Sequence, residues 1–245
     1  MNDSQWLSSG DHVKALCDRR FGFGADGVIE SFLGESGLPY MHLVNSDGSI
    51  AEMSGNGLRC LIHHLVRVGI LEISSQSKVE TMAGERRFQS LGYETQNTFI
   101  SKVQMPKASA KDMEIEGFKG SFVDVGNPHF VILCDSKDHL ESLNLLALGP
   151  RVEGSFGSGA NVEWIYVESP RRVHLRVWER GAGETLACGT GSVASYITLL
   201  ARDLPVSKVE VVNPGGSLWV QADEDEEILW LEGSSTYIGD VYEAS

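Results

Sequence analysis

The sequence has few cysteines, few basic residues and no long apolar run. Its four cysteines form no Cys-x-x-Cys pair and no His/Cys cluster with metal-ligand spacing, which argues against a zinc site and a disulfide framework. Only 20 Lys and Arg residues accompany 34 Asp and Glu, so the formal charge is −14 and the basic patch that nucleic acids or anionic membranes need is missing. No run of eighteen apolar residues and no signal-like N-terminus occurs. We therefore expect a globular cytoplasmic protein with free thiols, no metal, and no membrane or nucleic-acid partner.

The stretch from Val177 to Ser192 (VWERGAGETLACGTGS) places Cys188 between a glycine-rich turn and an apolar segment of helical length. Residues 193–201 are apolar nearly all round, which predicts a buried helix. The N–H groups at its start lack intrahelical acceptors and carry the positive end of the helix dipole, so they favour a bound carboxylate and a thiolate. From these residues alone, a second interpretation stays open, in which Cys188 is a small buried apolar residue and the glycines only form a turn.

A second copy of this pattern occurs in the first half of the chain. The tetrapeptide SGNG at 54–57 corresponds to CGTG at 188–191, and apolar residues at helical spacing follow it up to Gly69. The repetition predicts two halves of similar design whose helix starts face one anion. Such an arrangement suits a reaction that removes a proton from one face of a carbon and returns it on the other.

Further polar residues stand at predicted turns. Asn45 follows a predicted strand, His129 follows an Asn-Pro turn, and Glu179-Arg180 follows a predicted strand at 172–178. Each has a structural interpretation, as a turn cap, a satisfied turn histidine or a solvated ion pair. Beside a thiolate at a helix start, Glu179 and Arg180 are also suited to bind the ammonium and carboxylate of an amino acid.

The polar segment at 106–118 separates the two glycine-rich copies and contains Pro106. It predicts a first domain over 1–112, to which a C-terminal strand at 235–245 returns, and a second domain over 113–234. Residues 78–105 alternate polar and apolar side chains around turn residues, which predicts an antiparallel meander, and 237–242 is predicted as the last strand.

Three blocks, DGSIAEMSGNGLRC, GNPHF and WERGAGETLACGTGS, resemble the diaminopimelate epimerases in order and spacing, and FGFGADG matches a fourth block. The resemblance covers nearly the whole chain. It implies an α+β fold of two pseudo-symmetric halves, each a mixed β-barrel wrapped around a central helix. It also implies a homodimeric two-base epimerase that works without a cofactor and interconverts LL- and meso-2,6-diaminoheptanedioate for lysine and peptidoglycan precursor synthesis. No lysine stands in a recognisable pyridoxal phosphate motif.

The resemblance also implies individual roles. Cys188 is one catalytic acid or base, Ser54 occupies the position of the other, and His129 and Glu179 lie near the reacting centre. The implied substrate-binding residues are Asn45, Gly55, Asn56, Asn127, Asn161, Glu179, Arg180, Gly189 and Thr190.

Two departures from the family pattern stand out. The usual residue at position 54 is cysteine, and the hydroxyl of Ser54 is a far weaker acid and base than a thiol near pH 7. The family's initial strand with its GNDF block is absent, so we expect a truncated start or an incompletely formed first barrel. Three alternatives therefore remain: a related amino-acid racemase or dehydratase with Cys188 as its sole base, a catalytically impaired binding protein, and an engineered Ser54 that traps substrate.

Overall fold

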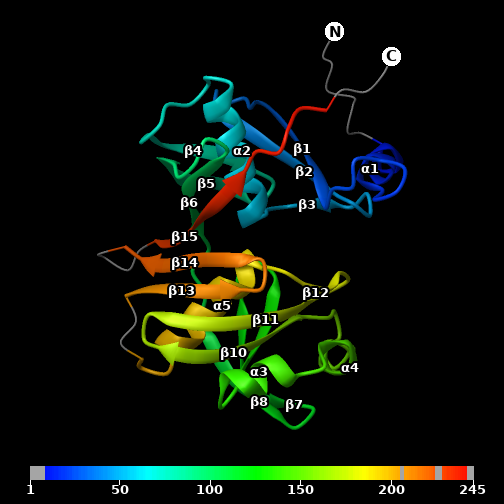
Figure 1. Cartoon of the computed structure of the whole chain (residues 1–245), viewed down its shortest axis with the longest axis vertical. Helices are drawn as coiled ribbons and strands as arrows, with labels where there is room; N and C mark the ends of the chain where they lie inside the picture. Colours follow the sequence, from blue (N-terminus) through cyan, green and yellow to red (C-terminus); the bar gives the residue numbers. More distant parts are fainter. Residues whose placement is uncertain (1–8, 205–206, 224–227, 242–245) are drawn as a thin grey trace. The chain divides into compact units, whose positions relative to one another are not determined.

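The structure is a computed structural model that describes residues 9–204, 207–223 and 228–241. Strands dominate it, and the chain divides into two compact units, residues 1–103 with 234–245 and residues 104–233 (Figure 1). The fold is α+β with a mixed sheet, as the sequence predicts. Within the described ranges, no helix is long and apolar enough to cross a membrane, and no group of three or more His, Cys, Asp or Glu side chains is arranged to hold a metal ion.

The first unit is built on a sheet in the order β1-β2-β4-β5-β6, with the short β3 paired to β2. All of its strand pairs that follow directly in sequence are antiparallel, whereas β2 and β4 are parallel and are separated by helix α2, which packs on β1 and β2. Its elements are α1 (Gly10–Cys17), β1 (Gly27–Leu33), β2 (Pro39–Asn45), β3 (Ile50–Ala51), α2 (Gly55–Arg67), β4 (Gln76–Thr81), β5 (Gly84–Tyr93) and β6 (Thr98–Met105). The strands β4, β5 and β6 confirm the predicted meander.

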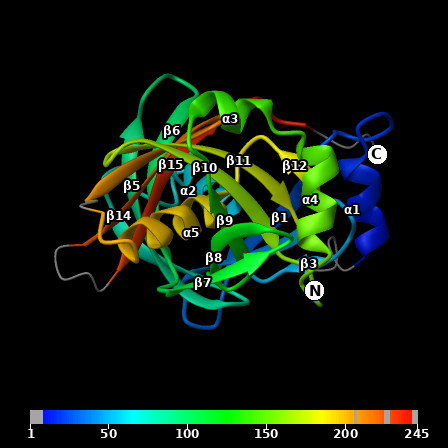
Figure 2. The same cartoon turned by 90° about the horizontal axis from the view of Figure 1, so that it is seen from below.

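The second unit has the strand order β15-β14-β13-β11-β10-β9-β8-β7, with β12 paired to β11. Its parallel pairs are β9 with β10 and β11 with β13. Helix α5 contacts β7, β8, β9, β10 and β14, so the strands curve around it (Figure 2). The elements are β7 (Ala110–Ile115), β8 (Phe118–Asp124), β9 (Pro128–Leu133), α3 (Lys137–Ser142), α4 (Leu145–Glu153), β10 (Asn161–Ser169), β11 (Arg172–Glu179), β12 (Gly183–Thr185), α5 (Gly189–Leu200), β13 (Lys208–Asn213), β14 (Gly216–Ala222) and β15 (Leu229–Thr236).

Helix α5 is the buried centre of the second unit. Every residue from Gly191 to Leu199 is buried, because the helix has no polar face to turn to solvent. Its buried serines satisfy their hydroxyls locally: Ser192 Oγ donates to the Cys188 carbonyl and Ser195 Oγ to the Gly191 carbonyl, both at 2.8 Å. The predicted buried helix is confirmed, and it begins at Gly189, directly after Cys188.

Helix α2 is amphipathic instead. Its buried face includes Leu58, Leu61, Ile62 and Leu65, the apolar residues at helical spacing. The chain leaves the helix through Gly69, whose φ of 75° lies in the left-handed region. The helix predicted after the SGNG tetrapeptide is confirmed.

Two sequence predictions need correction. The boundary expected between residues 112 and 113 would cut β7, which is polar because it is an edge strand and which pairs with β8 along its whole length. The units instead divide after Val103, near the end of β6, and before Ser234, near the end of β15. The strand expected at 237–242 is wrong over its described part: β15 ends at Thr236, and Tyr237 is fixed by its N–H to the Asn97 carbonyl at 2.8 Å. Residues 242–245 lie outside the described residues.

Candidate active site

Cys188 is the N-cap of α5. Its backbone is extended, its side chain is 3% exposed, and its Sγ accepts a hydrogen bond from the Gly191 N–H at 3.3 Å. Thr190 Oγ1 lies 3.4 Å from the same sulfur. The N–H groups of Gly189 and Thr190 are in the first turn and have no intrahelical acceptor by the geometry of a helix. The thiol therefore stands beside N–H donors that suit a carboxylate.

His129 is fully buried behind this helix start. Its Nδ1 lies 2.7 Å from Glu163 Oε1, and its Nε2 lies 3.0 Å from Asn127 Oδ1 and 3.4 Å from Asn161 Nδ2. The parallel pairing of β9 with β10 sets His129 opposite Asn161. Asn127 Nδ2 reaches Thr190 Oγ1 at 3.5 Å. The structure thus brings together residues that are up to 63 positions apart in sequence.

Glu179 is the last residue of β11, Arg180 follows it, and both border this cluster. Asn161 Oδ1 accepts from the Arg180 N–H at 2.8 Å, and the Arg180 guanidinium donates to the Ser158 carbonyl at 3.1 Å. Glu179 accepts a hydrogen bond from the Thr185 hydroxyl. Arg180 is exposed and Glu179 is half-buried, so both are at least partly in contact with solvent.

The electrostatics at Cys188 differ from the expectation of a thiolate. Burial raises the pKa of Cys188 well above its ordinary value, and the carboxylates of Glu179 and Glu163 raise it further. The hydrogen bonds from Thr190 and the Gly191 N–H lower it, by less. Desolvation and two negative charges outweigh the helix dipole, so the side chain is a thiol at neutral pH.

Ser54 holds the same position in the first unit as Cys188 in the second. It is the extended N-cap of α2, and its Oγ accepts from the Gly57 N–H at 3.0 Å. Gly55 and Asn56 are the first two residues of α2, so their N–H groups have no intrahelical acceptor. Gly55 is buried and Asn56 is exposed. The corresponding bond at Cys188 also runs to the residue three positions on, so the two helix starts repeat one local geometry.

Arg59 is buried one turn into α2, and sequence reasoning missed it. Its guanidinium donates to the Gly55 carbonyl at 3.2 Å and to Asn56 Oδ1 at 2.8 Å. Burial lowers its pKa to about 10, so it remains charged at neutral pH. In the part of the chain that the structure describes, no carboxylate forms an ion pair with it. The Arg59 charge therefore adds to the positive potential of this helix start.

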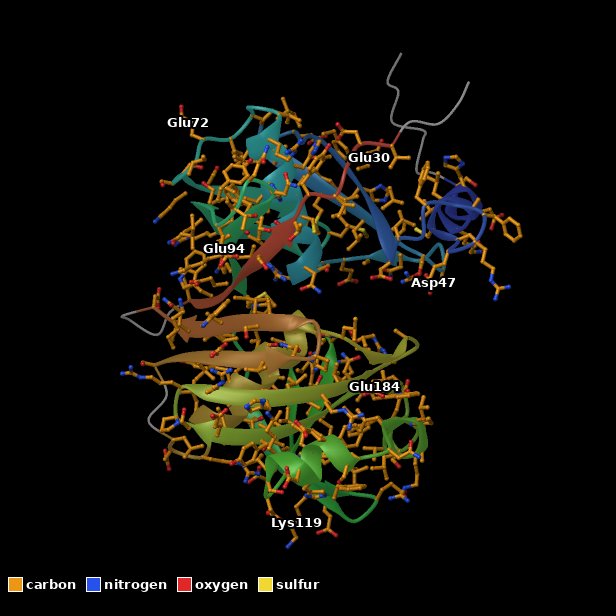
Figure 3. All side chains as sticks on the ribbon, in the orientation of Figure 1. Glu30, Asp47, Glu72, Glu94, Lys119 and Glu184 are labelled. Carbon is orange, nitrogen blue, oxygen red and sulfur yellow. The ribbon has the colours of Figure 1, made fainter. Side chains whose placement is uncertain are left out.

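Asn45 lies at the end of β2, in the turn that leads to β3. Its Nδ2 donates to Ser49 Oγ at 3.0 Å, and Asp47, labelled in Figure 3, accepts from the Ser49 N–H at 2.8 Å. These bonds fit its interpretation as a turn residue. Its role in substrate binding stays a prediction.

Two buried residues in the second unit belong to the site and were missed. Glu163 binds His129, and Asn213 accepts from the Cys188 N–H at 3.4 Å while its amide donates to the Val211 carbonyl at 3.0 Å. Glu163 carries a usable signal, because two residues after Asn161 in a strand its side chain lies on the same face. Asn213 carries none, since only the pairing of β13 with β11 brings it close.

The comparisons with known proteins identify the family. The family model described as "Diaminopimelate epimerase" matches residues 2–110 and 121–238. The chain belongs to the diaminopimelate epimerase family. A diaminopimelate epimerase of Synechococcus sp. (strain JA-2-3B'a(2-13)) is 37% identical over 258 residues, covering 96% of this chain and 90% of the relative. That of Carboxydothermus hydrogenoformans is 38% identical over 244 residues, covering 93% and 84%.

Solved structures show the same fold at low identity to this diaminopimelate epimerase family member. A hydroxyproline epimerase from Agrobacterium vitis superposes with a TM-score of 0.68 at 14% identity, covering 95% of this chain and 80% of that one. A phenazine biosynthesis protein of the PhzF family from Bacillus anthracis gives 0.67 at 17% identity, with 87% and 82% covered. The fold of two halves, each with a mixed sheet around a helix, is thus shared across these proteins.

Proposed function

We propose that this protein is a diaminopimelate epimerase that interconverts LL- and meso-2,6-diaminoheptanedioate without a cofactor, in lysine and peptidoglycan precursor synthesis. Besides membership of the family, one structural observation supports the proposal. Each unit starts its central helix with a side chain that bears an exchangeable proton, Cys188 in one and Ser54 in the other, held by the N–H three residues on.

The helix starts provide the groups that would hold the reacting carboxylate. In the second unit these are the N–H groups of Gly189 and Thr190, and in the first unit those of Gly55 and Asn56. When the α-proton leaves, negative charge develops next to this carboxylate, and fixed N–H dipoles stabilise it without reorganising. Arg59 strengthens the positive potential in the first unit.

The polar residues around the second helix start would bind the rest of the amino acid. We assign the ammonium group to Glu179 and a carboxylate to Arg180, because a carboxylate and a guanidinium fork match those charges. Asn127 and Asn161 contribute amides on the same side of His129. Asn45 is the corresponding candidate in the first unit.

The proton transfers follow from the two side chains. Cys188 starts as a thiol because its pKa is raised, so it is ready to protonate the carbanion on its face. The carbanion forms only after Ser54 has accepted the α-proton on the other face, which a hydroxyl does poorly at neutral pH. We therefore expect a working but slow enzyme, since one placed acid or base contributes about a hundredfold to ten-thousandfold.

Ser54 also favours a second candidate function. A site with one thiol can exchange the α-proton on a single face, as in a one-base racemase or dehydratase acting on another amino acid. A further alternative is a protein that binds the amino acid through the carboxylate site but catalyses no reaction. Both give products or exchange patterns different from those of an epimerase.

The deciding experiment follows the α-protons of LL- and meso-diaminopimelate by proton NMR in deuterium oxide. An epimerase incorporates deuterium and forms the other isomer, and Cys188→Ala loses both. Cys60→Ala, which removes an exposed cysteine on α2, serves as the matched control and should keep the wild-type rate. Exchange without epimer formation would support the one-base candidate, whereas binding without any exchange would contradict an enzymatic role.

The oligomeric state and the cellular location of the protein are also proposed here. We propose a homodimer in the cytoplasm, with a small-molecule substrate as its ligand. The formal charge of −14 argues against nucleic acid and anionic membranes as further partners.

A further inference from the structure

Glu163 and His129 form a buried pair beneath the start of α5. They come from the parallel neighbours β10 and β9, both side chains have 0% exposure, and Glu163 Oε1 lies 2.7 Å from His129 Nδ1. At this separation a proton lies between the two atoms, because without it both would turn a lone pair toward the other and repel. Neither the family resemblance nor the proposed mechanism uses Glu163.

A chain of polar contacts links this pair to the thiol. From His129 Nε2 it runs to Asn127 Oδ1 at 3.0 Å, from Asn127 Nδ2 to Thr190 Oγ1 at 3.5 Å, and from Thr190 Oγ1 to Cys188 Sγ at 3.4 Å. Every link lies within the second unit. Glu163 is therefore the far end of a polar path that ends at Cys188.

Glu163 also touches the helix start directly. A Cβ atom on Gly191 would lie 2.6 Å from Glu163 Oε1 and 3.1 Å from its Cγ, so only glycine leaves room for this carboxyl group. The N–H of the same Gly191 donates to Cys188 Sγ. The carboxyl group thus lies against the turn that holds the sulfur.

Two groups lie near His129 Nε2: the acceptor Asn127 Oδ1 at 3.0 Å and the Asn161 amide nitrogen at 3.4 Å. We assign the Nε2 proton to the shorter contact, with Asn127 Oδ1 as its acceptor. One further proton lies between His129 Nδ1 and Glu163 Oε1, which makes the pair neutral overall. Within the described residues Glu163 Oε2 has no hydrogen-bond partner, and a fully ionised carboxylate left half-paired in the interior is costly. A carboxyl group that keeps a proton close avoids that cost.

We propose that Glu163 is a positioning residue of this site. Through the proton on His129 Nδ1 it fixes the orientation of the imidazole ring, so that Nε2–H points to Asn127 Oδ1. It also supplies the negative end of a buried pair beside the Cys188 turn, which keeps Cys188 protonated. The inference rests on the proposed function, because the proton kept on Cys188 is the one that epimerisation transfers. Glu163 touches neither substrate nor reacting carbon in this assignment and acts through its neighbours.

The charges around Cys188 support this assignment. The titratable groups that face it are Glu163 from β10 and Glu179 from the end of β11, with His129 from β9 behind Glu163. Burial raises the pKa of Glu163, and His129 lowers it by less. Both carboxyl groups raise the pKa of Cys188, so removal of either lowers it and increases the thiolate fraction at a given pH.

The test is Glu163→Gln in the full chain. Glutamine keeps the size of the side chain and one hydrogen bond to His129 but neither the charge nor the shared proton. We expect the rate of Cys188 alkylation by iodoacetamide at pH 7, followed by peptide mass spectrometry, to rise at least threefold. We expect kcat for epimerisation to fall about tenfold while KM changes less than twofold, and the pH profile of kcat/KM to move to lower pH.

Two controls separate this from loss of structure. The buried Cys134 in the same unit reports unfolding, and its alkylation should stay slow in the variant. Glu210→Gln makes the same chemical change on β13, where Glu210 accepts from Ser217 at 2.7 Å, and should leave Cys188 alkylation unchanged.

The outcomes distinguish this inference from the proposed function. Wild-type alkylation of Cys188 and wild-type kcat in Glu163→Gln would overturn the role of Glu163 while leaving an active epimerase. Faster alkylation of both Cys188 and Cys134 would also overturn it, since Glu163 would then be a structural residue. Faster alkylation of Cys188 alone supports the role of Glu163, and it does so even if the unmodified protein forms no epimer, in which case only the proposed function fails.

Discussion

At the residue scale, the two N-cap side chains share a backbone position but differ in chemistry. Ser54 Oγ and Cys188 Sγ each accept from the N–H three residues on, so the two helix starts offer both groups the same backbone hydrogen bond. Their intrinsic acidities are far apart, because a thiol ionises much more easily than a hydroxyl. The hydroxyl therefore limits the proposed reaction.

This difference predicts a gain of activity. Ser54→Cys supplies a thiol on the weaker face, and we expect the rate of epimer formation to rise at least about tenfold, at the low end of what a placed acid or base contributes. The measurement is the initial rate of meso product from the LL isomer by NMR. Ser31→Cys, on the exposed part of β1, adds a thiol outside the site and should have no effect. A Ser54→Cys rate equal to that of the unmodified protein would show that Ser54 takes no part in proton transfer.

At the element scale, α5 shows what sequence patterns reveal. Its uniform apolar composition is enough to predict a buried helix, and the spacing in α2 is enough to predict an amphipathic one. The short helices α3 and α4 escape such reasoning, because six and nine residues hold too few turns for a clear period. The polar composition of β7 predicts a linker instead of a strand, since an exposed edge strand is as polar as a loop.

The same limit applies to the site. Cys188 and the glycines beside it are local, so a motif reveals them. Glu163 and Asn213 reach the site only through the pairing of β10 with β9 and of β13 with β11, which is a property of the folded sheet. Residues of this kind are found by geometry and not by spacing.

The burial of α5 predicts a sharp contrast between two adjacent leucines. Leu199 has 0% exposure and Leu200 has 39%. Leu199→Ala leaves a cavity between α5 and the strands, so we expect it to lower the free energy of unfolding by about 2–5 kcal/mol. Leu200→Ala should cost less than about 1 kcal/mol, because most of its surface is already in water. Urea unfolding of both variants checks this, and equal losses would mean that α5 is not enclosed as described.

At the scale of the whole molecule, net charge is the dominant feature. The formal charge is −14 at pH 7 and the sequence pI is near 4.9, so like charges repel across the surface at neutral pH. The ion pairs on the surface, such as Lys14 with Asp11, are exposed and contribute little. Repulsion should therefore outweigh attraction in the response to salt.

This balance predicts a salt effect that depends on pH. Raising NaCl from 0.01 to 0.2 M shortens the Debye length from about 30 Å to below 10 Å, which screens the repulsion. At pH 7.5 we expect the midpoint of thermal unfolding, Tm, to rise by about 2–4 °C, the shift that roughly 1 kcal/mol produces in a chain of this size. At pH 5, near the pI, the same change of salt should leave Tm nearly constant. Calorimetry at both pH values decides it, because a fall in Tm with salt at pH 7.5 would show that ion pairs, and not repulsion, dominate the surface.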